Sequence, residues 1–248
     1  MIIESRANER VKKARKLLQR KERKESGQHL IEGEKLVREA ISSGARVVSC
    51  FVEEGYAFSP PESAIAHIVN RSVLESLCES QTPQGVVAVV ETPSLTPPAA
   101  YPSGLVVVLD GVQDPGNVGT VIRTANAFGI DAVVLTGACA ELYAPKTVRA
   151  TMGAIFRQRV FQVELGGLAA FLESRGLPLY GAALSPAAED IRAVPVSAAA
   201  VAVGSEGKGL SAELLSVCAG QLIIPMQPDS ESLNAAVAAA VIMWEMAR

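Results

Sequence analysis

The sequence has few of the residues on which several common kinds of enzyme depend. Only two histidines, His29 and His67, occur among 248 residues, so neither a histidine-rich zinc site nor a Ser-His-Asp triad is expected. The four cysteines are widely spaced, form no CxxC pair and lie in apolar sequence, which favours buried, reduced thiols. We therefore expect no bound metal and a reaction that does not centre on histidine.

Long apolar runs and an apolar leader are also lacking. The alanine-rich stretch 233–244 is too short to span a bilayer, and the opening residues MIIESRANERVKK contain no apolar signal core. With 49% hydrophobic and 20% charged residues, the chain has enough apolar side chains for one large domain or two small ones. These features predict a soluble, cytoplasmic protein with no membrane contact.

The charge that is present lies unevenly. Residues 1–24 contain ten Lys or Arg against three Glu, although the net charge of the chain is only −3. A basic segment on an otherwise acidic protein suggests contact with a polyanion such as nucleic acid. The alternative is a solvated amphipathic helix, because Val11, Ala14, Leu17 and Leu18 follow helical spacing. The charge pattern alone leaves both interpretations open.

Hydrophobic periodicity predicts two α/β domains. In the first, residues 1–95, we expect helices at 32–44 and 72–78 and strands at 46–52, 64–69 and 85–90. Residues 96–104 are rich in Pro and Ser and are interpreted as a linker. In the second, residues 105–248, the expected strands are 105–109, 132–135, 158–163, 179–183, 199–203 and 222–224. Because helices alternate with these strands, we expect a mostly parallel sheet with both faces covered.

Two loops at predicted strand ends carry polar residues that packing does not require. In 109–129, the turn DPGN places Asn117 where an N-cap belongs, and Arg123 is long enough to reach back over the start of that helix. In VAVGSEGKGLS, 201–211, three glycines allow close approach of a ligand, and Glu206 favours a neutral or cationic one. The alternatives are an ordinary cap with an exposed arginine, and a plain surface turn.

A third segment, 222–245, joins a short strand to the closing helix. Ser232 is the expected cap of that helix, and Asn234 is expected to point from its first turn. One helix face is rich in small and apolar residues and is either core or a dimer interface. That face consists of Leu233, Ala236, Val237, Ala240, Val241 and Trp244.

Together these segments resemble the SpoU/TrmH family of the SPOUT superfamily. NxGTVIRTANAFG, GSEGKGLS and IPM…SLNAAVA are similar, in that order, to the three family motifs, and HLIEGEKLVREAI and LCESQTPQGVVAVV look like its ribosomal-protein-like substrate-binding domain. The resemblance implies methyl transfer from S-adenosylmethionine to a ribose 2′-hydroxyl of RNA. It also implies a C-terminal trefoil knot and a homodimer formed through the C-terminal domain.

The resemblance also assigns site residues by motif position. The implied catalytic residues are Asn117, Arg123, Glu206, Ser232 and Asn234. The implied cofactor-binding residues are Leu135, Thr136, Gly137, Gly204, Gly207, Ile224, Met226 and Leu233. The implied RNA-binding residues of the basic segment are Arg10, Lys12, Lys13, Arg15, Lys16 and Arg20.

The third motif departs from the family pattern. Pro228 stands where many members have glycine, and SLNAAVA replaces the common SLNVSVA, which leaves the path of that loop in doubt. The N-terminal substrate-binding domain resembles that of the family's ribosomal RNA enzymes, which suggests large-subunit (23S) ribosomal RNA as the substrate. The alternatives are transfer RNA, a non-catalytic RNA-binding assembly factor with the same fold, and a nucleotide-dependent α/β enzyme.

Overall fold

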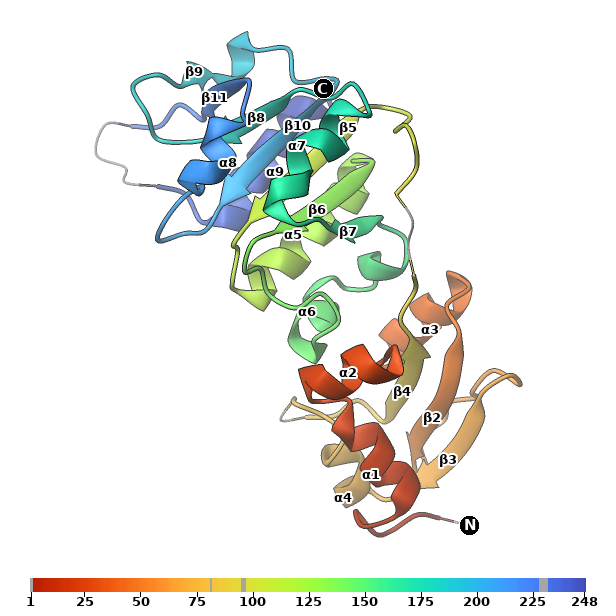
Figure 1. Cartoon of the computed structure of the whole chain (residues 1–248). Coiled ribbons are helices and arrows are strands. Elements are labelled where there is room, and N and C mark those ends of the chain that lie inside the picture. Colours follow the sequence, from red (N-terminus) through yellow and green to blue (C-terminus); the bar gives the residue numbers. More distant parts are fainter. Residues whose placement is uncertain (1, 81, 95–96, 228–231) are drawn as a thin grey trace. The chain divides into compact units, whose positions relative to one another are not determined.

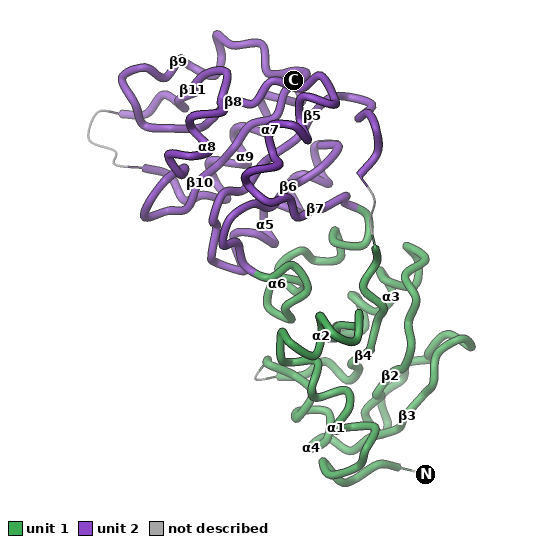
Figure 2. Tube along the Cα trace, in the orientation of Figure 1, with its two compact units in different colours: residues 1–94, 141–157 green, residues 95–140, 158–248 purple. Residues whose placement is uncertain are grey.

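The computed structural model describes residues 2–80, 82–94, 97–227 and 232–248. The chain folds into two compact units (Figure 2). Unit 1 comprises Met1–Ser94 and Glu141–Arg157, and unit 2 comprises Leu95–Ala140 and Gln158–Arg248. Pro228, whose effect on the third-motif loop was in question, lies outside the described residues.

Unit 1 is built on a four-stranded sheet of order β1-β4-β2-β3. Its strands are β1 (Gln28–Glu32), β2 (Val47–Glu53), β3 (Ile65–Val69) and β4 (Val86–Glu91). β4 pairs antiparallel with β1 and β2, while β2 and β3 are parallel. Its helices are α1 (Glu9–Lys16), α2 (Arg20–Ser26), α3 (Glu34–Ser42), α4 (Arg71–Glu75) and α6 (Pro145–Ala150), followed by the 3-10 turn η1 (Ala154–Phe156).

The core of unit 1 explains why its first basic residues form a helix. Val11, Ala14 and Leu17 are buried at helical spacing and pack with Phe51 and Val89 of the sheet, so the basic residues between them face outward. Asn8 caps α1 by accepting a hydrogen bond from the Arg10 N–H. The expected amphipathic helix is therefore present.

The second piece of unit 1, Glu141–Arg157, is held by charged contacts. Arg23 is buried and donates from Nε and Nη2 to the Glu141 carboxylate at 2.7 and 2.5 Å. Arg149 pairs with Glu32 at 3.3 Å, and Arg157 pairs with Glu39. The predicted domain bounds placed these residues with 105–248. The difference arises because ion pairs formed across more than 100 residues leave no trace in local periodicity.

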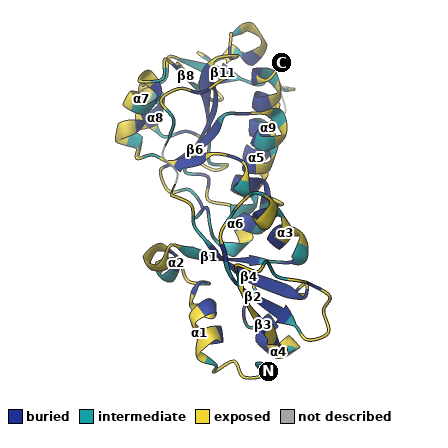
Figure 3. Cartoon of the chain, turned by 90° about the vertical axis from the view of Figure 1, so that its right-hand side faces the viewer, coloured by how far each residue is buried: buried dark blue, intermediate teal, exposed yellow. Residues whose placement is uncertain are grey.

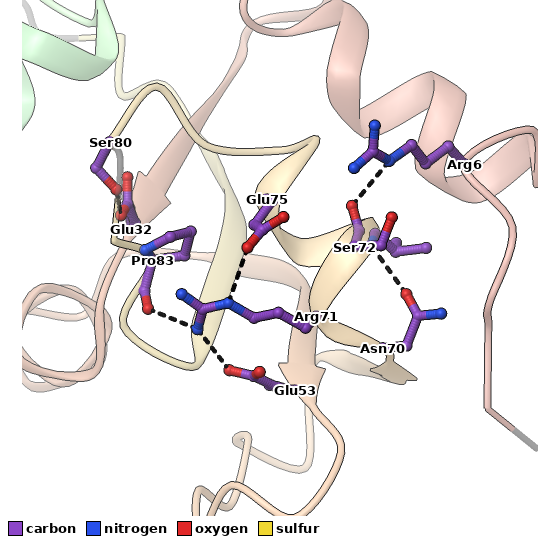
Figure 4. A network of polar contacts seen from close by, with 10 residues as sticks. Arg6, Glu32, Glu53, Asn70, Arg71, Ser72, Glu75, Ser80 and Pro83 are labelled. Carbon is purple, nitrogen blue, oxygen red and sulfur yellow. Dashed lines mark hydrogen bonds and ion pairs between the residues drawn. The ribbon is translucent and has the colours of Figure 1, made fainter.

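A further polar network fixes α4 and the loop that leads to β4 (Figure 4). The Arg71 guanidinium donates to Glu75, Glu53 and the carbonyl of Pro83, each at 3.1 Å. Because this network joins the end of β2, α4 and the loop before β4, it closes one end of the sheet.

Unit 2 contains a seven-stranded sheet of order β7-β6-β5-β10-β8-β11-β9, in which every pairing is parallel. Its strands are β5 (Leu105–Asp110), β6 (Ala132–Thr136), β7 (Val160–Gln162), β8 (Leu179–Ala182), β9 (Glu189–Asp190), β10 (Ala199–Gly204) and β11 (Gly220–Ile223). The central strands are buried on both faces, as their continuous apolar runs predict.

Helices cover both faces of this sheet. They are α5 (Pro115–Phe128), α7 (Leu165–Glu173), α8 (Ala212–Ser216) and α9 (Ala235–Met246), with the 3-10 turn η2 (Ile191–Ala193). Figure 3 shows the strands between α7 and α8 on one side and α5 and α9 on the other, and Figure 1 gives the order of the elements along the chain. Tyr101, within the predicted linker, is buried in the core beside Leu177.

The predicted α/β class and the mostly parallel sheet are confirmed. The strands β2, β3, β4, β5, β6, β8 and β10 lie within one or two residues of their predicted ranges. Strand β1 was not predicted. The helix expected at 32–44 begins at Glu34, since Gly33, with φ +94°, ends β1 and starts the helix. The knot stays a prediction.

Candidate functional site

A cavity of about 380 Å³ opens in unit 2 where three neighbouring parallel strands end. It is lined by residues that follow β8 and β11, by the loop after β10, and by the segment that enters α9. Carboxyl ends of strands are where open α/β sheets bind ligands. Its volume lies within the range of about 300–1,000 Å³ found for small-molecule sites. Of the predicted residues, it is lined by Gly204, Glu206, Ile224, Met226, Ser232 and Leu233.

The glycine loop after β10 folds back tightly on the strand end. Ser205 and Gly209 exchange backbone hydrogen bonds of 3.1 and 2.8 Å. A Cβ atom on Gly204 would lie 2.1 Å from the carbonyl carbon of Gly209, and Gly209 itself has φ +66°. Glycine at 204 is therefore required by the closeness of the returning backbone, and one wall of the cavity is main chain.

Asp110 anchors this loop, and it was not predicted from the sequence. It ends β5, is only 6% exposed, and its Oδ2 accepts the Ser211 N–H at 2.7 Å. A Cβ on Gly137 would lie 3.0 Å from the other carboxylate oxygen, so Gly137 leaves room for Asp110. The available signal was a single charged residue ending an otherwise apolar buried strand, LVVVLD.

Three of the five predicted catalytic residues form a hydrogen-bonded chain. The Asn117 amide donates to the Glu206 carboxylate, and the Asn234 amide donates to Asn117 Oδ1 at 3.2 Å. These residues are separated by up to 117 positions in sequence and come from α5, the glycine loop and the start of α9. The three motifs therefore converge on one polar network at the edge of the cavity.

Two predicted caps are corrected by the structure. Asp114, not Asn117, caps α5: its side chain accepts the Asn117 N–H at 3.0 Å, which frees the Asn117 side chain for Glu206. Asn234, not Ser232, caps α9 by accepting the N–H groups of Ala236 and Val237. In α5 the capping residue precedes the predicted one, and in α9 it follows the predicted one. In both helices the observed Asp or Asn side chain is the one that can reach the free N–H groups of the first turn.

The other predicted site residues lie apart from that network. Ser232 lines the cavity but makes no side-chain hydrogen bond in the ranges described. Arg123 is exposed on α5 and has neither a hydrogen bond nor an ion pair among the described residues. Leu135 and Thr136 are buried at the end of β6, and they, Gly137 and Gly207 do not line the cavity. The functional roles of all these residues stay predictions.

The predicted RNA-binding residues are all exposed in unit 1. They are Arg10, Lys12, Lys13, Arg15 and Lys16 on α1 and Arg20 at the start of α2. Lys12 pairs with Glu9 at 2.8 Å and Arg20 lies 4.0 Å from Glu141. Arg15 and Lys16 have no ion pair within the described chain, so their charges are available to a ligand.

The cysteines offer no ready nucleophile. Burial raises the pKa of the Cys50 and Cys218 thiols to about 11 and that of Cys78 to about 12, so all three stay protonated near neutral pH. Among the described residues, no group of three or more His, Cys, Asp or Glu side chains is placed to hold a metal. Within the same ranges, every helix is too short or too polar to span a bilayer.

Comparisons with known proteins agree with the motifs. The family model described as the SpoU rRNA Methylase family matches residues 104–244, and that of the MRM3-like substrate binding domain matches residues 8–88. The chain is 37% identical to the 23S rRNA (guanosine(2553)-2'-O)-methyltransferase RlmP of Bacillus subtilis (strain 168), over 98% of each protein.

Solved structures of similar proteins match both units. A crystal structure of an RNA 2'-O ribose methyltransferase has a TM-score of 0.83 at 32% identity, covering 99% of this chain and 98% of that one. The AdoMet-bound rRNA methyltransferase from Sinorhizobium meliloti has a TM-score of 0.88 at 27% identity, covering 99% and 97%.

Proposed function

Because the chain belongs to the SpoU rRNA methylase family, we propose that it transfers a methyl group from S-adenosylmethionine to a ribose 2′-hydroxyl of 23S ribosomal RNA. The observation that carries this proposal is the network of Asn117, Glu206 and Asn234 at the edge of the strand-end cavity. The similar protein of Bacillus subtilis is a 23S rRNA 2'-O-methyltransferase, and the similar rRNA methyltransferase from Sinorhizobium meliloti has AdoMet bound.

The cavity suits S-adenosylmethionine by size and chemistry. Its walls are mostly apolar, with Leu184, Val203 and Leu222 among them, and suit a base and a methylene chain. The Glu206 carboxylate adds a negative charge near which a sulfonium cation is favoured over a phosphate. When bound, the cofactor supplies an electrophilic methyl group on its sulfonium. The main chain of Gly204 and Ile224 would hold it.

The protein's own part is to orient the ribose and stabilise the oxygen that loses its proton. A guanidinium stays protonated at any pH relevant here, so Arg123 serves as an electrostatic clamp on the developing alkoxide and the adjacent phosphate rather than as a base. The Asn117–Glu206–Asn234 network positions the nucleotide, and Ser232 adds a hydroxyl at the cavity wall.

We also propose a homodimer formed through unit 2. The α9 side chains Val237, Val241 and Trp244 are 50%, 39% and 60% exposed and form one apolar stripe, which Phe128 of α5 extends by an edge-on contact with Trp244 at 5.6 Å. The family resemblance supports a second copy as the partner that covers it. Light scattering should give twice the chain mass, and Trp244→Glu should give a monomer.

Two further parts of the proposal follow from the family. The C-terminal segment is expected to thread through a loop of the backbone as a trefoil knot, which an experimental trace of residues 199–248 would test. A ribosomal RNA substrate supports a location in the cytoplasm, which is part of the proposal. Fractionation that finds the protein elsewhere would contradict that placement.

A methyl-transfer assay tests the activity. Tritiated S-adenosylmethionine is supplied with 23S ribosomal RNA, or with bulk transfer RNA, from cells that lack the gene. We expect label in the ribosomal RNA only. Label in transfer RNA alone would support the transfer RNA alternative, and cofactor binding without any transfer would support a non-catalytic assembly factor. A chain that binds ATP or NAD but not S-adenosylmethionine in calorimetry would instead be a nucleotide-dependent enzyme.

The role of Arg123 has its own test. Arg123→Ala should lower turnover at least 100-fold while the affinity for S-adenosylmethionine changes less than twofold. Arg159→Ala removes another exposed arginine of unit 2 and serves as the matched control. Near-wild-type turnover of Arg123→Ala would contradict the proposed clamp.

A further inference from the structure

Besides the cavity of unit 2, the molecule has a pocket of about 290 Å³ in unit 1, between α1 and the sheet. One side is formed by Arg10 and Lys13 of α1 and by Leu17, which follows that helix, and Ser49 of β2 and His67 of β3 lie on the sheet side. In the parallel pairing of β2 and β3, Ser49 lies opposite Ile65 and Phe51 opposite His67, so these four side chains share one face of the sheet. The pocket is thus a part of that face that α1 leaves open.

Two polar side chains in this pocket are nearly buried and lack partners. Ser49 is 9% exposed and His67 is 8% exposed, and neither side chain makes a hydrogen bond within the described part of the chain. Since both side chains line the pocket and neither has a protein partner, their polar groups are open to water or to a ligand there. The His67 ring is held against Phe51, with ring centroids 5.0 Å apart.

The charge state of His67 limits what it can bind. Burial lowers the pKa of the His67 imidazole, and the nearby charge of Arg10 lowers it further, so the ring is neutral at pH 7. A neutral imidazole donates one hydrogen bond and accepts another. Together with the Ser49 hydroxyl it therefore suits a group with mixed donors and acceptors, such as the edge of a nucleobase.

Other residues of the pocket match the other parts of a nucleotide, while Glu22 adds one carboxylate to its wall. Ile65, although on a strand, is 62% exposed and provides an apolar surface, and the buried Val89 lies on the other side of Ser49 from it. Arg10 and Lys13 are exposed at the wall and make no ion pair in the described ranges, so they can meet a phosphate. Proteins that read single-stranded RNA stack the splayed-out bases, most often on aromatic side chains, and hydrogen-bond their edges. Here the apolar surface of Ile65 takes the place of the aromatic ring.

We propose that this pocket holds one unstacked base of the RNA substrate, with its ring on Ile65, its polar edge on Ser49 and His67, and its phosphate on Arg10 and Lys13. The identity of the RNA rests on the proposed function. The pocket adds a base contact to what would otherwise be a sequence-blind grip by α1. Its volume, at the low end of small-molecule sites, admits one nucleotide and excludes a duplex.

The direct test uses the full chain with ¹³C-labelled isoleucine methyl groups and histidine rings. The probes are the single-stranded RNA hexamers U6 and A6, a blunt twelve-base-pair RNA duplex, and the mononucleotides UMP and AMP. We expect at least one hexamer to shift the Ile65 methyl and His67 ring signals in a saturable way, the duplex to leave them unchanged, and the mononucleotides to bind at least tenfold more weakly.

Substitutions separate the pocket from general charge. Ser49→Leu fills the pocket and should weaken hexamer binding at least tenfold. Ala66→Leu adds similar bulk at an exposed site on the neighbouring strand β3, outside the pocket, and should change binding less than twofold. His67→Phe keeps a ring of similar size but removes the edge contacts, and provides a second variant if Ser49→Leu folds poorly. Lys13→Ala should weaken binding severalfold more than Lys35→Ala on α3.

Several results would overturn the proposal. One is hexamer binding that leaves the signals of both Ile65 and His67 unshifted, and another is a duplex that shifts these signals as much as a hexamer does. A third is mononucleotides that bind as tightly as the hexamers, which would indicate a site for free nucleotides. S-adenosylmethionine affinity and methyl transfer are measured on the same wild-type preparation. Shifts without methyl transfer would leave the pocket standing and remove the proposed function, while methyl transfer without shifts would do the reverse.

Discussion

The two units of this chain form their pockets in different ways. In unit 2 the cavity wall is backbone returning on itself at Gly204, above a parallel sheet whose central strands are apolar on both faces. In unit 1 the pocket, and the packing of Glu141–Arg157, depend on polar and charged side chains such as His67 and Arg23. Unit 2 should therefore be sensitive to side-chain atoms added at its close-packed glycines, and unit 1 to changes of charge, pH and salt.

The largest effect is expected from Gly204→Ala in unit 2. The new Cβ would overlap the Gly209 carbonyl carbon, which lies 2.1 Å away, so the loop has to move and the cavity loses that wall. We expect at least a 1,000-fold loss of methyl transfer, about 4 kcal/mol, and loss of measurable S-adenosylmethionine binding by calorimetry. Gly167→Ala in α7 is the control, because a Cβ there meets nothing within 4 Å. Retained cofactor affinity in Gly204→Ala would contradict the backbone-wall account.

In unit 1 the largest expected loss comes from Glu141→Ala. It removes the carboxylate from Arg23, whose side chain is 6% exposed and also donates to the Leu17 carbonyl at 2.6 Å. Breaking a buried ion pair costs about 3–5 kcal/mol, and partial exposure of Glu141 places our expectation near the lower end of that range. Urea denaturation measures the loss. Glu25→Ala, in the exposed pair with Lys21, should cost less than about 1 kcal/mol. Equal effects of the two substitutions would remove the contrast between buried and surface charge.

A pH effect is expected from His29, which is fully buried in unit 1. Burial, and then the charge of Arg23, lowers its pKa to about 4, against 6.5 for the unperturbed group. Between these values the unfolded chain takes up a proton that the folded chain does not, so stability falls as the pH drops below about 6.5. The His29 contribution should make the free energy of unfolding about 2 kcal/mol lower at pH 5 than at pH 7.

The comparison variant for this effect is His29→Phe, because carboxylates elsewhere also contribute to acid sensitivity. The difference between wild type and variant isolates His29, whose Nδ1 lies 3.0 Å from the Thr92 hydroxyl and whose Nε2 has no partner among the described residues. If the stabilities of wild type and His29→Phe fall equally between pH 7 and pH 5, His29 has the same pKa in the folded and the unfolded chain, and the prediction is wrong.

The sequence predicts the structure of unit 2 better than that of unit 1. The apolar runs of unit 2 predict its central strands within about two residues, because strands buried on both faces leave a local signal. Glu141–Arg157 joins unit 1 through long-range contacts, among them ion pairs such as Arg149–Glu32, which no local periodicity marks. Strand β1 was missed because its five residues are a short stretch between the glycines at 27 and 33.

The sequence motifs identified residues of the candidate site, but not the hydrogen bonds that join them. The motifs supplied Asn117, Glu206 and Asn234, yet their mutual hydrogen bonds arise only where α5, the glycine loop and α9 meet. The cap assignments depended on which Asx side chain reaches the first turn, a matter of backbone geometry that residue type does not settle. Asp110 was missed since its partner, the Ser211 N–H, is 101 residues away.

The smallest expected effect concerns the basic face of α1. Arg15 and Lys16 are exposed, lack ion pairs in the described chain and lie outside the unit 1 pocket, so we expect them to bind phosphates without reading bases. Each phosphate that is no longer neutralised should reduce the slope of log K against log salt concentration by about 0.7–0.9. Arg15→Ala and Lys16→Ala should each do so in filter binding to 23S ribosomal RNA, while Lys35→Ala on α3 should not. An unchanged slope for both would make the Arg15 and Lys16 face of α1 a solvated one, because a charge that neutralises no phosphate releases no counterion. The affinity of unit 1 for RNA would then have to come from the pocket, with its Arg10 and Lys13, alone.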